Sequence, residues 1–387
     1  MTPNALLRPL AARDPDQPHR VSTTLELFFD LVSVIAIAAV TAGLHHAISD
    51  GHGVDALPAF VFLFLAIWWA WMNFTWFASA FDNDDAVYRI LVMVVMGGAL
   101  IFAGGAEQIF KTLDFGVGLL GWIVMRVGMI ALWLRAAAGS PAHRATALRY
   151  AAGIGVAQVG WTVLYLTTDP GSTAFFIGGA LCFLLEWAVP PLAESRAITP
   201  FHRHHIIERY GLLMIISLGE VVLAISIGFG ALYGDAPAWD AAPVSVAGLV
   251  IVFALWWLYF CEHDHLPNRK LSTSLVWGYV HVVIFMGAAV LGAALAAAID
   301  LATDHSKATP DAVALWMGAA IASVLAGLWV ARDRLMPLPV WRQAALPVMA
   351  AVILMAGVAG LPAGVMAALM VATVVWRTWG PAPGHAH

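Results

Sequence analysis

Twelve runs of about twenty mostly apolar residues dominate this chain of 387 residues. A helix needs about 20 apolar residues to cross the hydrocarbon core of a bilayer, because each residue adds only about 1.5 Å of length. The composition agrees, with 61% apolar and 11% charged residues. The sequence therefore predicts an all-α integral membrane protein with about 12 transmembrane helices, over residues 23–45, 57–80, 87–108, 117–136, 147–167, 173–192, 205–229, 243–261, 275–299, 311–331, 340–359 and 361–378.

Loop charges predict the orientation. Cytoplasmic loops of membrane proteins collect Lys and Arg, and with twelve spans 15 of the 19 Lys and Arg residues fall on the side that holds both termini. Only Lys111 and Lys307 fall on the other side. We therefore expect cytoplasmic termini. The polar residues 1–22 read as a cytoplasmic tail and not a cleaved signal, since they lack an apolar core, and residues 380–387 read as a disordered tail.

Two halves of the chain resemble each other. When Glu26 is aligned with Glu208, "AIWWAWMNF" (66–74) faces "ALWWLYFCE" (254–262), and "VMGGALIFAG" (95–104) faces "FMGAAVLGAA" (285–294). The pattern predicts two six-helix membrane repeats, residues 23–192 and 205–379, joined by a cytoplasmic linker at 193–204. Because six is even, both repeats enter the membrane in the same direction, as in transporters with two parallel halves.

Two acids interrupt the first apolar run. Glu26, Asp30, Ser33 and Ile37 fall on one stripe of the predicted helix. A charge at lipid depth costs ~2.5–3.5 kcal/mol even on the gentlest scale, so the stripe is expected to face other helices or water. The acids either pair with basic residues and fix helix packing, or serve function. The basic candidates are Arg20, Arg203 and Arg209.

Other charged groups lie inside the predicted spans. Glu208 and Arg209 stand at the mouth of the seventh span, and Glu220 near its middle has no basic residue within one turn, which makes it a plausible proton carrier. An unpaired Arg126 near the centre of the fourth span is untenable. His281 could titrate near neutral pH or serve as a packing residue. The carboxylates that could pair with Arg126 are Glu107, Glu186 and Glu220.

Acids also flank the second and eighth spans. Clusters of carboxylates at a membrane surface can hold Mg²⁺ and a diphosphate, which keeps a membrane enzyme as an alternative. The Asn-Asp-x-x-Asp spacing of such enzymes is absent, and acids beside a helix usually cap it. We expect no metal, cofactor, enzymatic activity or nucleic-acid partner. The clusters are Asp82, Asp84 and Asp85 in the first copy, and Glu262 and Asp264 in the second.

Four blocks carry a family resemblance. "HRVSTTLELFFDLVSVIAIA", "FDNDDAVYRI", "ERYGLLMIISLGEVVLAIS" and "LWWLYF" resemble the signature blocks of the bacterial low temperature requirement A family, in the same order. The resemblance implies a multi-pass protein of the bacterial inner membrane and implies no particular activity. "FFDLVSVIAIAAV" alone is similar to the first helix of the lysosome-type potassium channel family. Phe28 and Asp30 match that family's pattern, and the resemblance implies that Ile35 and Ile37 line a pore. Thr24, Phe29 and Leu212 depart from the pattern.

These observations favour a membrane transporter of an ion or small solute, coupled to protons. Asp30 and Glu220 would be the membrane-embedded acidic sites, with Arg126 as counter-charge. Alternatives are a cation channel lined by the first helix of each repeat, and a membrane sensor or scaffold. A channel is disfavoured by Leu212, which stands where the second copy would repeat Asp30. The expected partners are the lipid bilayer and a small ion or solute, and the repeat suits a monomer or a homodimer.

Overall fold

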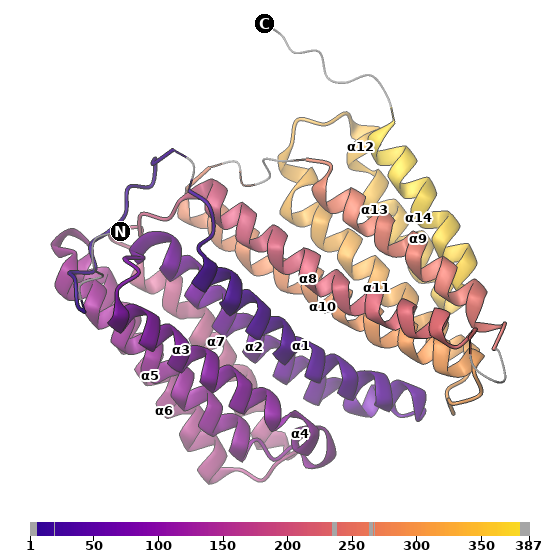
Figure 1. Ribbon diagram of the computed structural model, residues 1–387, viewed down its shortest axis with the longest axis horizontal. Coiled ribbons are helices and arrows are strands. Elements are labelled where there is room, and N and C mark those ends of the chain that lie inside the picture. Colours follow the sequence, from indigo (N-terminus) through magenta and orange to yellow (C-terminus); the bar gives the residue numbers. More distant parts are fainter. Residues whose placement is uncertain (1–5, 19, 234–237, 263–265, 267, 380–387) are drawn as a thin grey trace, which may run out of the picture. The chain divides into compact units, whose positions relative to one another are not determined.

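The computed structural model describes residues 6–18, 20–233, 238–262, 266 and 268–379 (Figure 1). These residues form helices and connecting loops, with no strand among them. The helices of the first half are α1 (Thr24–Ser49), α2 (Gly53–Phe81), α3 (Ala86–Gly104), α4 (Ala106–Thr112), α5 (Gly116–Gly139), α6 (Arg144–Thr167) and α7 (Thr173–Ala193). Those of the second half are α8 (Arg203–Gly230), α9 (Ala241–Phe260), α10 (Leu271–Ala302), α11 (Pro310–Ala331), α12 (Val340–Gln343), α13 (Ala345–Val358) and α14 (Ala363–Thr378).

A helix coincides with each of the twelve predicted runs, but not every one meets the length and hydropathy of a membrane span. Ten helical segments in the described part of the chain do so, counting α3 with α4 and α12 with α13 as one each. α6 is long enough but less apolar than the others, and α14 has only 16 residues. A multi-pass helical membrane protein is thus confirmed, while twelve spans remain a prediction.

The chain forms two compact units whose limits fall inside helices. Unit 1 comprises residues 1–43, 58–213 and 268–275, and unit 2 comprises residues 44–57, 214–267 and 276–387. The start of α8 therefore belongs to unit 1, and the end of α1 to unit 2. The division into repeats at residues 193–204 is a different partition and stays a prediction.

In unit 1, α3 packs on α5, α5 on α6 and α6 on α7. Aromatic rings fill the space between them. The ring of Phe62 lies within 6.5 Å, centroid to centroid, of Phe102, Phe115, Trp161 and Phe183. Aromatic rings of this size bury much apolar surface between the helices.

Unit 2 packs α11 on α13, α9 on α14 and α13 on α14. A buried carboxylate, that of Asp333, connects neighbouring ends of these helices. Asp333 lies 2.6 Å from Nε of both Arg332 and Arg377. Arg332 also donates to the Leu258 carbonyl at 2.6 Å, and Arg377 pairs with Glu262 at 3.1 Å. The ends of α9, α11 and α14 are therefore held together by charge-assisted hydrogen bonds.

Glycines set the closest helix contacts within each unit. A Cβ atom added at Gly98 of α3 would lie 2.6 Å from the Met125 amide nitrogen and 2.7 Å from the Gly121 carbonyl oxygen of α5. In unit 2, a Cβ atom at Gly318 of α11 would lie 2.9 Å from Cα of Gly357 in α13. Backbones this close admit no side chain, which is how small residues drive helix association in membranes.

We expect Gly98→Ala to lower the midpoint of thermal unfolding in detergent. The added methyl group meets backbone atoms that cannot rotate away, and overpacking of this kind costs about 1–3 kcal/mol. The neighbouring Gly97 has nothing within 4 Å of its Cβ position, so Gly97→Ala is the matched control. Alanine favours the helix there, and its midpoint should stay or rise. Equal losses in both variants would contradict the close packing of α3 and α5.

Candidate functional site

Seven titratable side chains of unit 1 form what we call the charge cluster. They come from the segment before α1, from the starts of α1 and α8, and from the residue after α2. All are buried except Arg13, whose side chain is 26% exposed. The members are the guanidiniums Arg13, Arg20 and Arg209, the carboxylates Glu26, Asp30 and Asp82, and the imidazole His205.

Asp30 is held by a two-point ion pair. Arg209 donates from Nε to Oδ2 at 3.0 Å and from Nη2 to Oδ1 at 2.6 Å. The indole of Trp71 donates to Oδ1 at 2.7 Å. Both side chains of the ion pair are 0% exposed. Three donors aimed at one carboxylate compensate for its removal from water.

Glu26 is the centre of the cluster. Its Oε1 lies 3.2 Å from Arg20 Nη2, 3.2 Å from His205 Nε2 and 3.3 Å from Arg209 Nη1. Its Oε2 accepts from the amide of Thr23 at 2.7 Å, while the Thr23 hydroxyl accepts from the Glu26 amide at 3.3 Å. This reciprocal arrangement is a capping box at the start of α1. The backbone geometry of the helix start thus fixes the central carboxylate.

His205 is the member whose charge is not determined by its partners. Its side chain is 0% exposed, and neither ring nitrogen makes a hydrogen bond with a described residue. Its Nε2 is at ion-pair distance from Glu26 without hydrogen-bond alignment. With neutral His205 the cluster has three positive and three negative charges. A proton on the imidazole would add one uncompensated charge, and imidazole is the side chain that ordinarily titrates near neutral pH.

Asp82 forms the outer edge of the cluster, beyond the end of α2. Its Oδ2 lies 3.3 Å from Arg13 and 3.6 Å from Arg20. Burial, followed by the nearby charge of Glu26, raises the pKa of Asp82 to about 6, and the two guanidiniums offset part of that effect. Asp82 is therefore a second group of the cluster that exchanges a proton near neutral pH.

The other acids beyond α2 serve as a helix cap and as ion pairs. Asp85 caps α3 by accepting from the Tyr88 amide at 2.7 Å, and it pairs with Arg135 at 2.6 Å. Asp84 pairs with Arg89 at 2.6 Å. No group of three or more His, Cys, Asp or Glu that could hold a metal occurs within the residues described. In the second copy, Glu262 pairs with Arg377, and Asp264 lies outside the described residues.

Arg126 pairs with Glu186, one of the three carboxylates expected for it. The two form a second buried ion pair in unit 1. Arg126 Nη2 lies 2.9 Å from Oε1, and the Trp69 indole donates to Oε2 at 2.9 Å. The guanidinium also lies over the ring of Trp122, 4.8 Å from its centroid. Of the other two candidates, Glu107 pairs with Lys111 on α4. The ion pair between Arg126 and Glu186 joins α5 to α7 about midway along α5.

The remaining predicted residues have separate surroundings. Ser33 donates to the Phe29 carbonyl of its own helix at 2.9 Å, and Ile37 is buried. Glu208 accepts from the Ser22 amide at 3.3 Å. In unit 2, Glu220 is half-buried and has no hydrogen bond or ion pair with a described residue, whereas His281 is buried with Nδ1 2.7 Å from the Trp277 carbonyl.

Sequence reasoning did not identify Arg13, Trp71 or His205 as partners of the acids in the charge cluster. The pattern Thr23-x-x-Glu26 was a usable signal, because a capping box places the glutamate against the chain that precedes the helix. Nothing local indicates Trp71, which is 41 residues from its acceptor Asp30.

Removing Arg209 should destabilise the protein strongly, because it leaves Asp30 and Glu26 buried with too few positive partners. Breaking one side of a buried ion pair costs about 3–5 kcal/mol. We therefore expect a large fall in the thermal midpoint for Arg209→Gln and partial recovery in Asp30→Asn/Arg209→Gln. Additive losses in this double-mutant cycle would show that the two groups do not interact.

Asp82 should make stability depend on pH. Its folded pKa is above the ordinary value of 3.8, so its contribution is fully present below pH 3.8 and is lost as the pH rises through about 6. The shift of about two units corresponds to at most about 3 kcal/mol. In Asp82→Asn, the thermal midpoint should fall less between pH 5 and about 7.5 than in the wild type. Asp84→Asn, at an exposed neighbour, should retain the wild-type slope, and an unchanged slope in Asp82→Asn would contradict the prediction.

Comparisons with known proteins agree with this architecture. A sequence profile described as bacterial low temperature requirement A protein (LtrA) matches residues 21–378. An uncharacterized protein of Rhizobium meliloti (strain 1021) is 25% identical over 335 residues, which cover 81% of this chain and 78% of that protein. No solved structure matches the chain significantly. With its apolar helices and a match over nearly its whole length, the chain belongs to the bacterial low temperature requirement A protein family.

Proposed function

We propose that the protein is a membrane transporter of a small solute or ion, coupled to protons through the charge cluster. The observation that carries the proposal is His205, a fully buried imidazole 3.2 Å from Glu26 in a cluster of balanced charge. The side chain is 0% exposed, so a proton taken up there adds a positive charge that is out of contact with solvent. Because buried charges must be paired, protonation favours a different arrangement of the starts of α1 and α8.

Glu220 supplies a second proton site on the same helix. It lies eleven residues beyond Arg209 on α8, which is about 16 Å along the helix axis. A protonated carboxyl crosses the membrane without the charge penalty that a carboxylate incurs. Proton exchange at Glu220 and at His205 would therefore act on the same helix, α8. Arg126 remains a counter-charge in this proposal, neutralised by Glu186.

A cation channel lined by the first helix has less support. Asp30 would have to present free negative charge to a passing ion, but its carboxylate already accepts three hydrogen bonds from Arg209 and Trp71. The enzyme alternative is weakened in the same way, since Asp82, Asp84 and Asp85 are engaged in ion pairs and in capping. Cytoplasmic termini and an inner-membrane location belong to the proposal and rest on the distribution of loop charges.

The test is proton movement in proteoliposomes, followed with a pH-sensitive dye under imposed K⁺ and Na⁺ gradients. We expect proton movement in the wild type and its loss in His205→Gln and in Glu220→Gln, because glutamine keeps a polar side chain and removes the titrating group. His281→Gln is the matched control, since it replaces a buried imidazole outside the charge cluster and should leave proton movement unchanged.

The outcomes separate the alternatives. Electrically driven cation flux that persists in Glu220→Gln would establish a channel and overturn the coupled mechanism. If folded wild-type protein moves no protons under either gradient, proton coupling in this simple form is wrong. An equal loss in His281→Gln would show that the assay reports general damage to buried histidine sites.

A further inference from the structure

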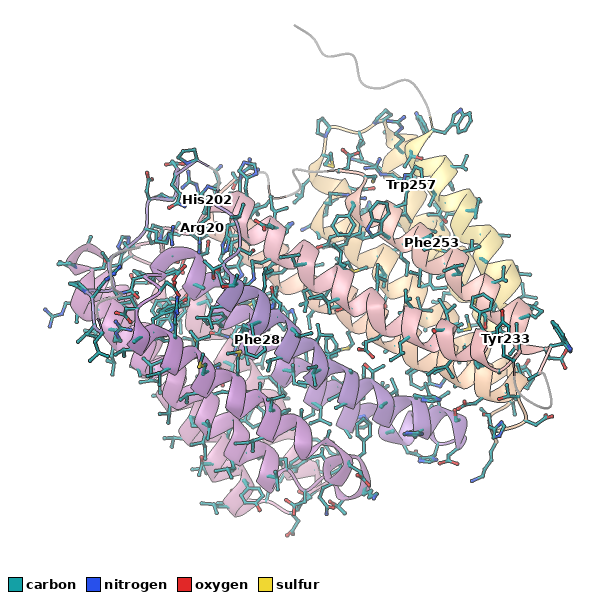
Figure 2. The ribbon with its side chains drawn as sticks, viewed as in Figure 1. Arg20, Phe28, His202, Tyr233, Phe253 and Trp257 are labelled. Atoms are coloured by element: carbon teal, nitrogen blue, oxygen red, sulfur yellow. The ribbon has the colours of Figure 1, made fainter. Side chains whose placement is uncertain are left out.

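A polar pocket of about 590 Å³ opens in unit 1 beside the charge cluster. It lies where the segment before α1 meets the start of α8, and Figure 2 shows Arg20 and His202 close together there. Its charged and titratable lining consists of Arg20, Arg203, Arg269, His202, His204 and Asp16. All of these residues belong to unit 1.

Positive charge prevails in the pocket. Among the described residues of its lining, four side chains are formally charged: three are arginines, and the acid, Asp16, is paired with Arg269. His202 adds no charge, because its Nε2 bonds to the Gln17 carbonyl at 3.0 Å and its Nδ1 accepts from the His205 amide at 3.2 Å. These bonds fix one neutral tautomer, in agreement with burial, which lowers the pKa of His202.

Two features point to an anionic ligand. Three arginines line the pocket, and Arg20 among them is held in place by Glu26, which lies 3.2 Å from its Nη2. In addition, the 28-residue helix α8 begins at Arg203, a residue that lines the pocket. The N-terminus of a helix carries partial positive charge and attracts anions. Three arginines and a helix N-terminus therefore border one cavity.

We propose that this pocket binds a phosphate-type dianion, either as a free phosphomonoester or as the headgroup of an anionic lipid. Guanidinium groups match the oxygens of phosphate in charge and in fork-like geometry. The volume is within the range of small-molecule sites, about 300–1,000 Å³, so an organic part fits beside the phosphate. Anion binding at this site can be measured without any flux, so its test does not depend on the proposed transport mechanism.

The substitutions that test the pocket must leave the charge cluster intact. Arg20 belongs to both sites, so its substitution would also release Glu26 and Asp82. Arg203 and Arg269 line the pocket and are not members of the charge cluster. Arg89, a half-exposed arginine of unit 1 that pairs with Asp84 outside the pocket, provides the matched control.

The experiment is calorimetric titration of the full-length protein in detergent with inorganic phosphate, at constant ionic strength set with chloride. We expect saturable binding to the wild type and to Arg89→Gln. In Arg203→Gln/Arg269→Gln the affinity should fall by at least about tenfold, since the anion loses two of its guanidinium partners. Unchanged affinity in the double variant, or no saturable binding to the folded wild type, would overturn the proposal.

A second arm identifies the source of the phosphate. The same titration is made in nanodiscs of phosphatidylcholine, with and without phosphatidic acid. If phosphatidic acid abolishes phosphate binding in the wild type, the lipid headgroup occupies the pocket. If phosphate binds equally in both nanodiscs, the ligand is a soluble phosphate compound. Either result supports the anion site.

Discussion

The ion pair between Asp30 and Arg209 is the interaction on which the arrangement of unit 1 depends. A carboxylate removed from water costs several kcal/mol unless charge and hydrogen bonds replace the solvent. Here the replacement comes from a guanidinium 179 residues away and from the indole of Trp71. Three helices, α1, α2 and α8, must therefore be in place together. An apolar interface of equal area would tolerate rotation or sliding of these helices, whereas the two-point geometry of the guanidinium specifies one register.

The same constraint draws the chain before α1 into the fold. Leu10 is buried, and its backbone lies against Gly139 at the end of α5. Arg13 and Arg20 complete the positive charge that Asp82 and Glu26 require. A segment that composition alone marks as a polar tail thus contributes two of the three guanidiniums of the charge cluster. Its Pro and charged residues determine solubility, but they do not exclude fixed structure where buried acids need partners.

The sequence predicts the helices well because the length of a run of apolar residues can be read from the local sequence alone. It also shows that Arg126 needs a carboxylate, since an unpaired charge at that depth is untenable. It could not select Glu186 from three candidates, because the choice depends on which faces of α5 and α7 meet, 60 residues apart. The polar stripe of α1 was only partly informative. Ser33 and Thr41 donate to the Phe29 and Ile37 carbonyls of their own helix, so these hydroxyls need neither water nor another helix.

The ion pair also gives a physical reason for the imperfect repeat. When the two predicted repeats are aligned at Glu26 and Glu208, Asp30 faces Leu212 and Arg209 faces Leu27. A repeat that copied only the acid, or only the base, would place two like charges here, and like charges repel each other strongly in a medium of low dielectric constant. With the acid on α1 and the base on α8, each helix supplies what the other lacks. The burial of each charge therefore depends on the other helix, so the first helix of one predicted repeat depends on the first helix of the other.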